Sequence, residues 1–167
     1  MNLLFRLLAI VLRARRYRAG DFAPHQTARL VFRVLPTDLD FNLHMNNARY
    51  LSLMDLGRVD LLNRLGLLRL AFRGHWLPVL GAVSIRYQRP LQLWNRYELL
   101  TRIVGWDEKW FYLEQRFERA GKIVATAHVK ALVRGPTGSL PTVQVLDALH
   151  HRGPSPSLPP EVLRLPE

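Results

Sequence analysis

The chain has 167 residues, 49% of them hydrophobic and 22% charged, a composition typical of a single soluble globular domain. It contains no cysteine, which excludes disulfides, thiolate metal sites and a cysteine nucleophile, and agrees with a reducing compartment. Lys and Arg number 24 against 13 Asp and Glu, so the net charge is +11. Such an excess favours anionic partners: phosphorylated ligands, acidic carrier proteins, nucleic acid or anionic lipid.

The first 18 residues read MNLLFRLLAIVLRARRYR and contain five arginines but no acidic residue. The apolar run is short and interrupted by Arg6, so we do not expect it to span a bilayer. The cations follow the apolar run and no small-residue cleavage site comes after it, which argues against a signal peptide. Two interpretations remain open: a basic amphipathic helix that binds an anionic membrane reversibly, or a helix packed on its own domain.

Residues 27–35 alternate between apolar and polar side chains, which predicts a strand closed by a proline. From Asn47 the apolar residues recur at helical spacing, and the pattern predicts a helix of about twenty residues. We expect Gly66 to form its C-cap, and Asp60 and Arg64 to pair on its solvent-exposed side. The second half of this helix is very apolar, so the helix should be buried.

Four more strands are predicted after the helix, at residues 80–88, 97–104, 110–119 and 122–133. Their connections are short, which favours antiparallel hairpins, most clearly at Ala120-Gly121. The tail from Gly135 holds seven of the eleven prolines. It is expected to contain a short helix at 142–151, and its last dozen residues are expected to be extended or disordered.

This order of elements predicts an α+β fold, with one long central helix wrapped by a curved antiparallel sheet of about five strands. The predicted organisation is a basic amphipathic segment at 1–18, a globular domain at 19–150 and a Pro-rich tail at 151–167. Because such a sheet covers its helix on one side only, we also expect a second copy of the chain to pair with it.

The most informative stretch lies between the first strand and the helix and reads DLDFNLHMNNARY. Asp40, Asn42 and His44 fall two apart, and the pair Asn46-Asn47 follows. A carboxylate at a helix N-terminus could activate water or attack a carbonyl, and free N–H groups near Asn47 could stabilise the resulting oxyanion. A capped turn with a satisfied carboxylate would explain the same residues without any chemistry.

Several other site types are excluded. The sequence has no G-x-S-x-G elbow, no phosphate-binding G-x-x-x-x-G-K-[ST] loop, no H-E-x-x-H and no dinucleotide fingerprint. The six histidines lack the spacing of metal ligands. We therefore expect neither a metal nor a cofactor.

The quoted loop resembles the D-x-D-x-N-x-H-x-N-N-x-x-Y loop of hotdog-fold thioesterases. The likeness is greatest to the acyl-carrier-protein thioesterases and to acyl-CoA thioesterases of the 4-hydroxybenzoyl-CoA type, and it continues more weakly over residues 27–134. The resemblance implies a single hotdog fold. It also implies that Asp40 is the catalytic carboxylate, as base or nucleophile, that Asn42 and His44 accompany it, and that the backbone N–H of Asn47 polarises the thioester carbonyl.

One position departs from the family pattern. The acyl-carrier-protein enzymes have a glutamate on the strand after the helix, and Gln88 stands there in this chain. Either that acid is dispensable, or the reaction depends on Asp40 alone. Asp38, two residues earlier, is expected to matter far less.

The resemblance implies hydrolysis of an acyl-CoA or acyl-carrier-protein thioester by a homodimer, with a tetramer left open. Four basic residues are candidates for binding the phosphates of coenzyme A: Arg86, Arg89, Lys130 and Arg134. We expect a cytoplasmic protein with peripheral membrane contact through residues 1–18.

Two other functions remain open. A hotdog-fold hydratase or dehydratase would carry D-x-N-P-x-H, whereas here the Asp-to-His interval is one residue shorter and lacks proline. A non-enzymatic module could bind acyl chains, lipid or nucleic acid. Nucleic acid is disfavoured, because the aromatic residues are not interleaved with Lys and Arg.

Overall fold

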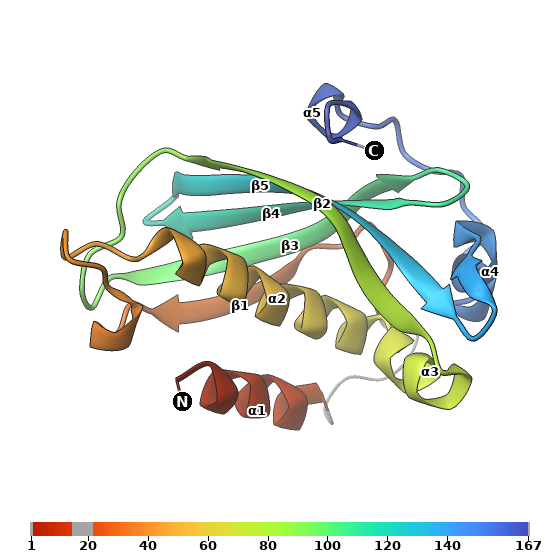
Figure 1. Cartoon of the computed structure of the whole chain (residues 1–167), viewed down its shortest axis with the longest axis horizontal. Helices are drawn as coiled ribbons and strands as arrows, with labels where there is room; N and C mark the ends of the chain where they lie inside the picture. Colours follow the sequence, from red (N-terminus) through yellow and green to blue (C-terminus); the bar gives the residue numbers. More distant parts are fainter. Residues whose placement is uncertain (1, 15–21, 167) are drawn as a thin grey trace.

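One antiparallel sheet curls around helix α2 (Asn47–Arg64) in the computed structural model, which describes residues 2–14 and 22–166 (Figure 1). The strands of the sheet are β1 (Ala28–Arg33), β2 (Leu77–Tyr87), β3 (Arg96–Trp106), β4 (Phe111–Arg119), β5 (Lys122–Gly135) and the short β6 (Gly138–Leu140). The other helical elements are α1 (Asn2–Ala14), the 3-10 turn η1 (Pro36–Asp38), α3 (Leu67–Gly74), α4 (Thr142–Ala148) and α5 (Pro160–Leu163). The predicted α+β architecture is confirmed.

The strand order is β1-β3-β4-β5-β2, with β6 beside β5, and every pair is antiparallel. The predicted β3–β4 and β4–β5 hairpins are confirmed, and Ala120 and Gly121 both take positive φ in the second turn. The hairpin predicted between β2 and β3 is wrong, because β2 pairs with β5 at the far edge. The connection 88–95 instead packs against the loop before α2, where the buried Leu91 accepts a hydrogen bond from the Met45 amide at 2.7 Å.

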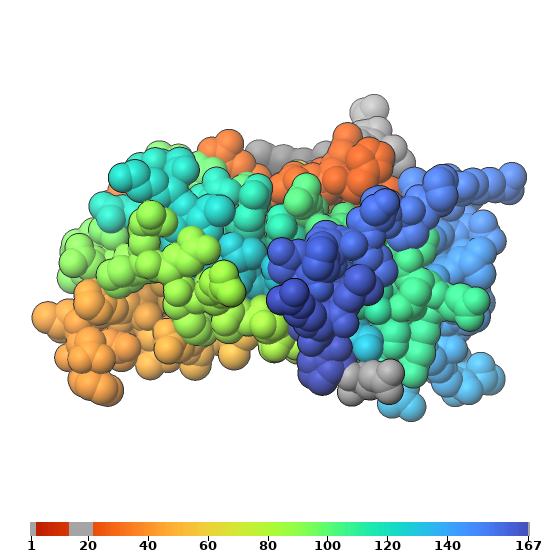
Figure 2. All heavy atoms as spheres, turned by 90° about the horizontal axis from the view of Figure 1, so that it is seen from above, coloured from red at the N-terminus to blue at the C-terminus, as the bar shows by residue number. Residues whose placement is uncertain are grey.

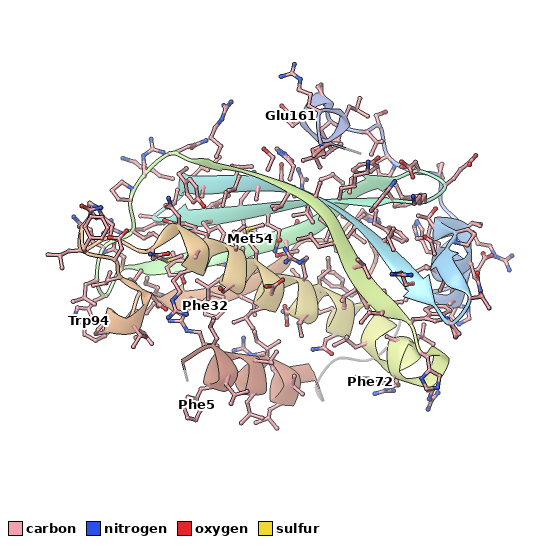
Figure 3. The ribbon with its side chains drawn as sticks, viewed as in Figure 1. Phe5, Phe32, Met54, Phe72, Trp94 and Glu161 are labelled. Carbon is pink, nitrogen blue, oxygen red and sulfur yellow. The ribbon has the colours of Figure 1, made fainter. Side chains whose placement is uncertain are left out.

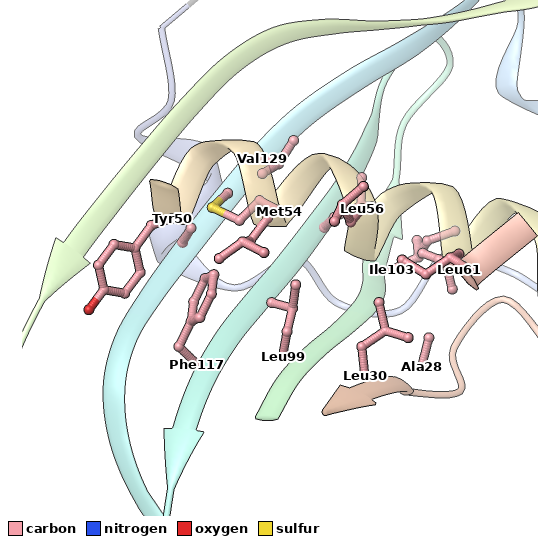
Figure 4. Packing of buried hydrophobic residues seen from close by; sticks show 14 of the residues in the cluster. Ala28, Leu30, Tyr50, Met54, Leu56, Leu61, Leu99, Ile103, Phe117 and Val129 are labelled. Atoms are coloured by element: carbon pink, nitrogen blue, oxygen red, sulfur yellow. The ribbon is translucent and has the colours of Figure 1, made fainter. Parts of the chain in front are cut away.

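The core lies between α2 and the concave face of the sheet. Tyr50 and Met54 of α2 pack against Phe117, Leu99 and Val129 of the sheet (Figure 4). The sheet and the helix each contribute one face to this core, because side chains alternate every 2 residues along a strand and recur every 3.6 residues along a helix. The N-terminal end of this packed helix is thereby fixed against β2 and the connection after it.

The predicted Asp60–Arg64 pair forms at 2.7 Å, but its predicted exposure is wrong. Asp60 is fully buried, and α1 packs against α2. The helix also ends earlier than predicted, with Leu65 as C-cap. Gly66 takes a left-handed conformation (φ 75°) and redirects the chain into α3, a short helix that the sequence did not predict.

Helix α1 lies on the outer side of α2, so the packed interpretation of the N-terminal segment is confirmed for residues 2–14. Ile10 is buried in the shared core and Leu3 and Leu7 pack against it. Residues 15–18 of the predicted basic segment lie outside the described residues. Within residues 2–14 and 22–166, no helix is both long and apolar enough to cross a bilayer.

The prediction that the last dozen residues are extended or disordered is wrong for Pro160–Leu163, which form α5. After the predicted short helix, now α4, residues 151–166 cross the face of the sheet opposite α2 (Figures 1 and 2). Val162 and Leu165 bury themselves there against Val104 and Tyr112. Apolar positions at the end of a Pro-rich stretch signalled this contact, but their spacing did not say which face they cover.

Candidate active site

The loop between η1 and α2 closes into a tight turn. Leu39 and Met45 form an isolated antiparallel β-bridge. The Asp40 amide donates to the His44 carbonyl at 2.9 Å, and the Leu43 amide donates to the Asp40 carbonyl at 3.1 Å. Leu43 takes a left-handed conformation (φ 59°) so that the chain can reverse. Asp40 and His44 are therefore opposed across one turn, with Asn42 at its tip.

The Asp40 carboxylate is half-buried and only partly engaged. Its Oδ1 accepts a hydrogen bond from the Asn42 amide at 2.9 Å, the local Asx turn that such a loop favours. Among the described residues, no group donates to its second oxygen. The capped-turn interpretation is therefore correct for one oxygen, and the other can still accept a proton or attack a carbon atom.

The first turn of α2 begins beside this loop. The Asn46 side chain caps the helix by accepting from the Ala48 amide at 2.8 Å, and its carbonyl accepts from the Arg49 amide at 2.9 Å. In the part of the chain that the structure describes, the Asn47 amide has no acceptor. A free N–H at the positive end of an 18-residue helix is suited to stabilise an oxyanion.

Asp38 has a different environment from Asp40. It is fully buried, its Oδ2 receives the Arg6 guanidinium of α1 at 2.7 Å and the Leu35 amide at 3.0 Å, and Arg49 lies 3.9 Å from Oδ1. Its carbonyl also accepts from the Asn46 amide at 2.9 Å. Asp38 therefore fixes α1, η1 and the start of α2 together.

The second wall of the site comes from β2 and the connection after it. The backbones of His44 and Gln92 form an isolated antiparallel β-bridge. The Tyr87 hydroxyl donates to the Asn47 carbonyl at 3.4 Å. Tyr87 also meets Tyr50 edge-on, with ring centroids 5.1 Å apart. Burial, reinforced by the neighbouring Tyr87, raises the pKa of Tyr50 to about 12. Burial also raises the pKa of Tyr87, so both hydroxyls keep their protons at neutral pH.

Tyr87 was missed by sequence reasoning. Its strand was recognised, but nothing in SIRYQRP indicates that this tyrosine faces the start of a helix forty residues earlier.

A model of the Thioesterase-like superfamily matches residues 34–164, a range that includes the loop, α2 and the whole remaining sheet. The chain belongs to this superfamily. The curled sheet around one helix is its hotdog fold.

Two relatives illustrate the sequence similarity. Protein THEM6 of Danio rerio is 54% identical over 85 residues, which cover 51% of this chain and 42% of that protein. Thioesterase lcsJ of Purpureocillium lilacinum is 27% identical over 103 residues, which cover 50% of this chain and 33% of that protein. The chain thus matches less than half the length of either relative.

Solved structures share the fold. YbaW Probable Thioesterase from Escherichia coli has a TM-score of 0.68 at 23% identity, covering 73% of this chain and 95% of that one. A Staphylococcus aureus protein solved in complex with CoA has a TM-score of 0.65 at 18% identity, covering 87% of this chain and 96% of that one.

An apolar cavity of about 330 Å³ opens at the other half of α2 of this thioesterase-like chain. Leucines of α2 and α3 line it together with Ile103 and Leu113 of the sheet and Leu146 of α4. Its charged lining residues, Asp55 and Arg58, form an ion pair with each other. The cavity can therefore hold an apolar group without leaving a charged side chain buried and unpaired.

The four candidate basic residues do not lie close together within one chain. Arg86 is exposed on β2 opposite Thr126, whereas Arg134 lies eight residues further along β5, roughly 26 Å away at the rise of a strand. Arg89 donates to the Ile123 carbonyl at 2.6 Å. Lys130 is buried beneath the C-terminal tail, with its ammonium 4.7 Å from the Trp110 ring centroid.

Gln88 follows β2 and is exposed, and its amide donates to the Val124 carbonyl at 2.8 Å. Within residues 2–14 and 22–166, no cluster of three His, Asp or Glu side chains could hold a metal ion.

Proposed function

We propose that this chain hydrolyses an acyl thioester, and that Asp40 carries the reaction. The observation that supports this most strongly is that one loop-to-helix segment carries two unengaged groups seven residues apart: the second carboxylate oxygen of Asp40, and the N–H of Asn47 at the start of α2. One supplies a negative charge for the nucleophilic step, and the other supplies a hydrogen-bond donor for the oxygen that becomes negative.

The reaction has two possible courses, which consume the same reactants and give the same products. Asp40 takes a proton from water, whose oxygen attacks the thioester carbon, or it attacks that carbon itself to form an anhydride that water then opens. The carbonyl oxygen becomes negative and is stabilised by the Asn47 N–H. The C–S bond then breaks, the thiol leaves with a proton, and the acid remains. Asn42 and His44 share the turn with Asp40 and would contact the substrate or the attacking water.

The substrate we propose is an acyl-CoA or acyl-carrier-protein thioester. The apolar cavity would take the acyl part, and the basic surface would attract the phosphates of the carrier. Arg86 lies near the end of β2, the strand that carries Tyr87 to Asn47, and Arg89 follows in the connection 88–95. Lys130 and Arg134 lie further along the sheet and could meet a carrier phosphate only at a different site.

We propose a homodimer that pairs through β2. This strand is one edge of the sheet, its exposed residues include Leu77, Leu80 and Tyr87, and an open apolar edge is a surface that proteins normally cover. The cavity begins at Asp55, eight residues along α2 from Asn47, about 12 Å at the rise of a helix. An antiparallel second copy would bring the Asp40 turn of one protomer toward the cavity of the other. A compact active monomer in sedimentation would contradict this.

We place the reaction in the cytoplasm, with reversible membrane contact through α1. The absence of cysteine suits a reducing compartment, and the basic N-terminal segment suits an anionic surface.

The experiment that tests the function is thiol release from a panel of acyl-CoA chain lengths and from the same acyl groups on acyl carrier protein. Turnover that depends on chain length is expected, because the cavity has a finite volume. No thiol release from any member of the panel would contradict the proposal.

A further inference from the structure

Helix α1 has two apolar faces, and only one is used within the chain. Leu3, Leu7 and Ile10 of the inner face pack on the core, and Arg6 pairs with Asp38. Helix α1 is therefore held on the domain by its own contacts.

The outer face of α1 is an uninterrupted apolar strip. Five large side chains are 46–68% exposed: Leu4, Phe5, Leu8, Val11 and Leu12. Their spacing of one, three and four residues places them on one side of the helix. A strip of this kind on a soluble domain marks an interaction surface.

A second element extends this surface. On α3, Phe72 is 83% exposed and its neighbours Arg69 and Arg73 are also exposed. Figure 3 places Phe5 of α1 and Phe72 of α3 at the same lower edge of the molecule. A flat surface lying along that edge would touch both helices.

We propose that the outer strip of α1 and Phe72 of α3 together form a docking face for an anionic lipid bilayer. The charge around this face selects that occupant. Arg13 is exposed at the end of α1, and Arg69 and Arg73 flank Phe72. A second copy docked on this same face would set Arg13, Arg69 and Arg73 against their own counterparts, whereas lipid phosphates would neutralise them.

Docking in this way leaves the fold unchanged. The inner face of α1 keeps the Arg6–Asp38 pair at 2.7 Å while the outer strip enters the lipid headgroup region, as surface-bound amphipathic helices do. This proposal extends beyond hydrolysis and does not depend on it, because binding is measured without turnover. Deleting α1 would be a poor test, since it would also expose the buried Asp38.

The test is co-sedimentation of the full chain with vesicles of phosphatidylcholine and phosphatidylserine in equal parts. The variant Phe5→Ser/Leu8→Ser removes two strip residues that are 66% and 53% exposed. Its matched control is Val143→Ser/Leu163→Ser, whose residues are 62% and 65% exposed on α4 and α5, away from the docking face. Thermal unfolding midpoints of both variants should equal that of the parent chain, because all four side chains are exposed.

We expect the strip variant to lose vesicle binding about tenfold or more, and Phe72→Ser to lose severalfold, since binding scales with buried apolar area. The control should bind like the parent, and phosphatidylcholine vesicles alone should bind all variants weakly. Equal binding by the strip variant and the control would overturn the proposal. It would also be overturned if Phe5→Ser/Leu8→Ser left vesicle binding intact and instead dissociated an oligomer.

Discussion

Asp38 and Asp40 are two residues apart in one loop, yet the fold gives them different environments. Asp38 is fully buried, and the Arg6 guanidinium and the Leu35 amide both donate to its Oδ2. Asp40 is half-buried and accepts one hydrogen bond, from the Asn42 amide, at one of its two oxygens. The first carboxylate has its hydrogen-bonding capacity used by the fold, and the second retains capacity for a substrate.

The difference shows how burial separates a structural acid from a reactive one. A buried carboxylate must be paired, because removing its partner leaves a charge without solvation. A reactive carboxylate needs an unengaged oxygen and a neighbouring donor for the transition state, and Asp40 has both at the start of α2. Each prediction below changes one side of this comparison.

The largest expected effect is on rate, from Asp40→Asn. The substitution keeps the side-chain size and the turn-forming acceptor for the Asn42 amide but removes the negative charge. We expect turnover of the best acyl thioester to fall about a hundredfold or more, with substrate binding and the unfolding midpoint unchanged. Steady-state thiol release and calorimetry measure the two. Near-normal turnover would mean that Asp40 only caps its turn.

The next effect is on stability, from Asp38→Asn. The substitution leaves Arg6 without its anion in a buried setting. We expect a loss of about 3 kcal/mol in the free energy of unfolding, measured in urea. Arg29→Gln is the control, since its pair with Glu98 is solvent-exposed and should contribute about 1 kcal/mol or less. Equal losses from the two variants would show that Asp38 does not anchor the loop.

A smaller loss is expected from Asn46→Ala, which removes the cap from the Ala48 amide. The free energy of unfolding should fall by about 1 kcal/mol. Gln144→Ala, on the exposed surface of α4, is the comparison variant and should change it little. A lower rate per folded molecule in Asn46→Ala would indicate that the cap also positions the Asn47 N–H.

The smallest effect is expected from Tyr87→Phe. Its hydroxyl makes one hydrogen bond of 3.4 Å to the Asn47 carbonyl, and the ring contact with Tyr50 remains in the variant. Stability should change by less than about 1 kcal/mol, and turnover by a few-fold at most. A loss as large as that of Asp40→Asn would move the chemistry from the carboxylate to this tyrosine.

The sheet, the long helix and the loop were predictable because each has a strong local pattern. Alternation marks β1, helical spacing marks α2, and Asn46 followed by Asn47 marks the helix start. These patterns depend only on which neighbours a residue has along the chain.

What failed depends on contacts between distant segments. The course of residues 88–95 depends on the loop before α2, and the end of the tail packs on the sheet through Val162 and Leu165. The buried Arg6–Asp38 pair likewise joins residues 32 positions apart. No local spacing encodes such pairs.

The most direct test compares Asp40→Asn and Asp38→Asn in one set of samples, with turnover expressed per folded molecule and plotted against the unfolding midpoint. The two substitutions are predicted to have opposite effects. Asp40→Asn keeps the parent unfolding midpoint and loses turnover about a hundredfold or more. Asp38→Asn loses stability, and its turnover per folded molecule stays within a few-fold of the parent. The opposite pattern, with turnover lost at Asp38 and retained at Asp40, would contradict the assignment of Asp40 as the reacting carboxylate.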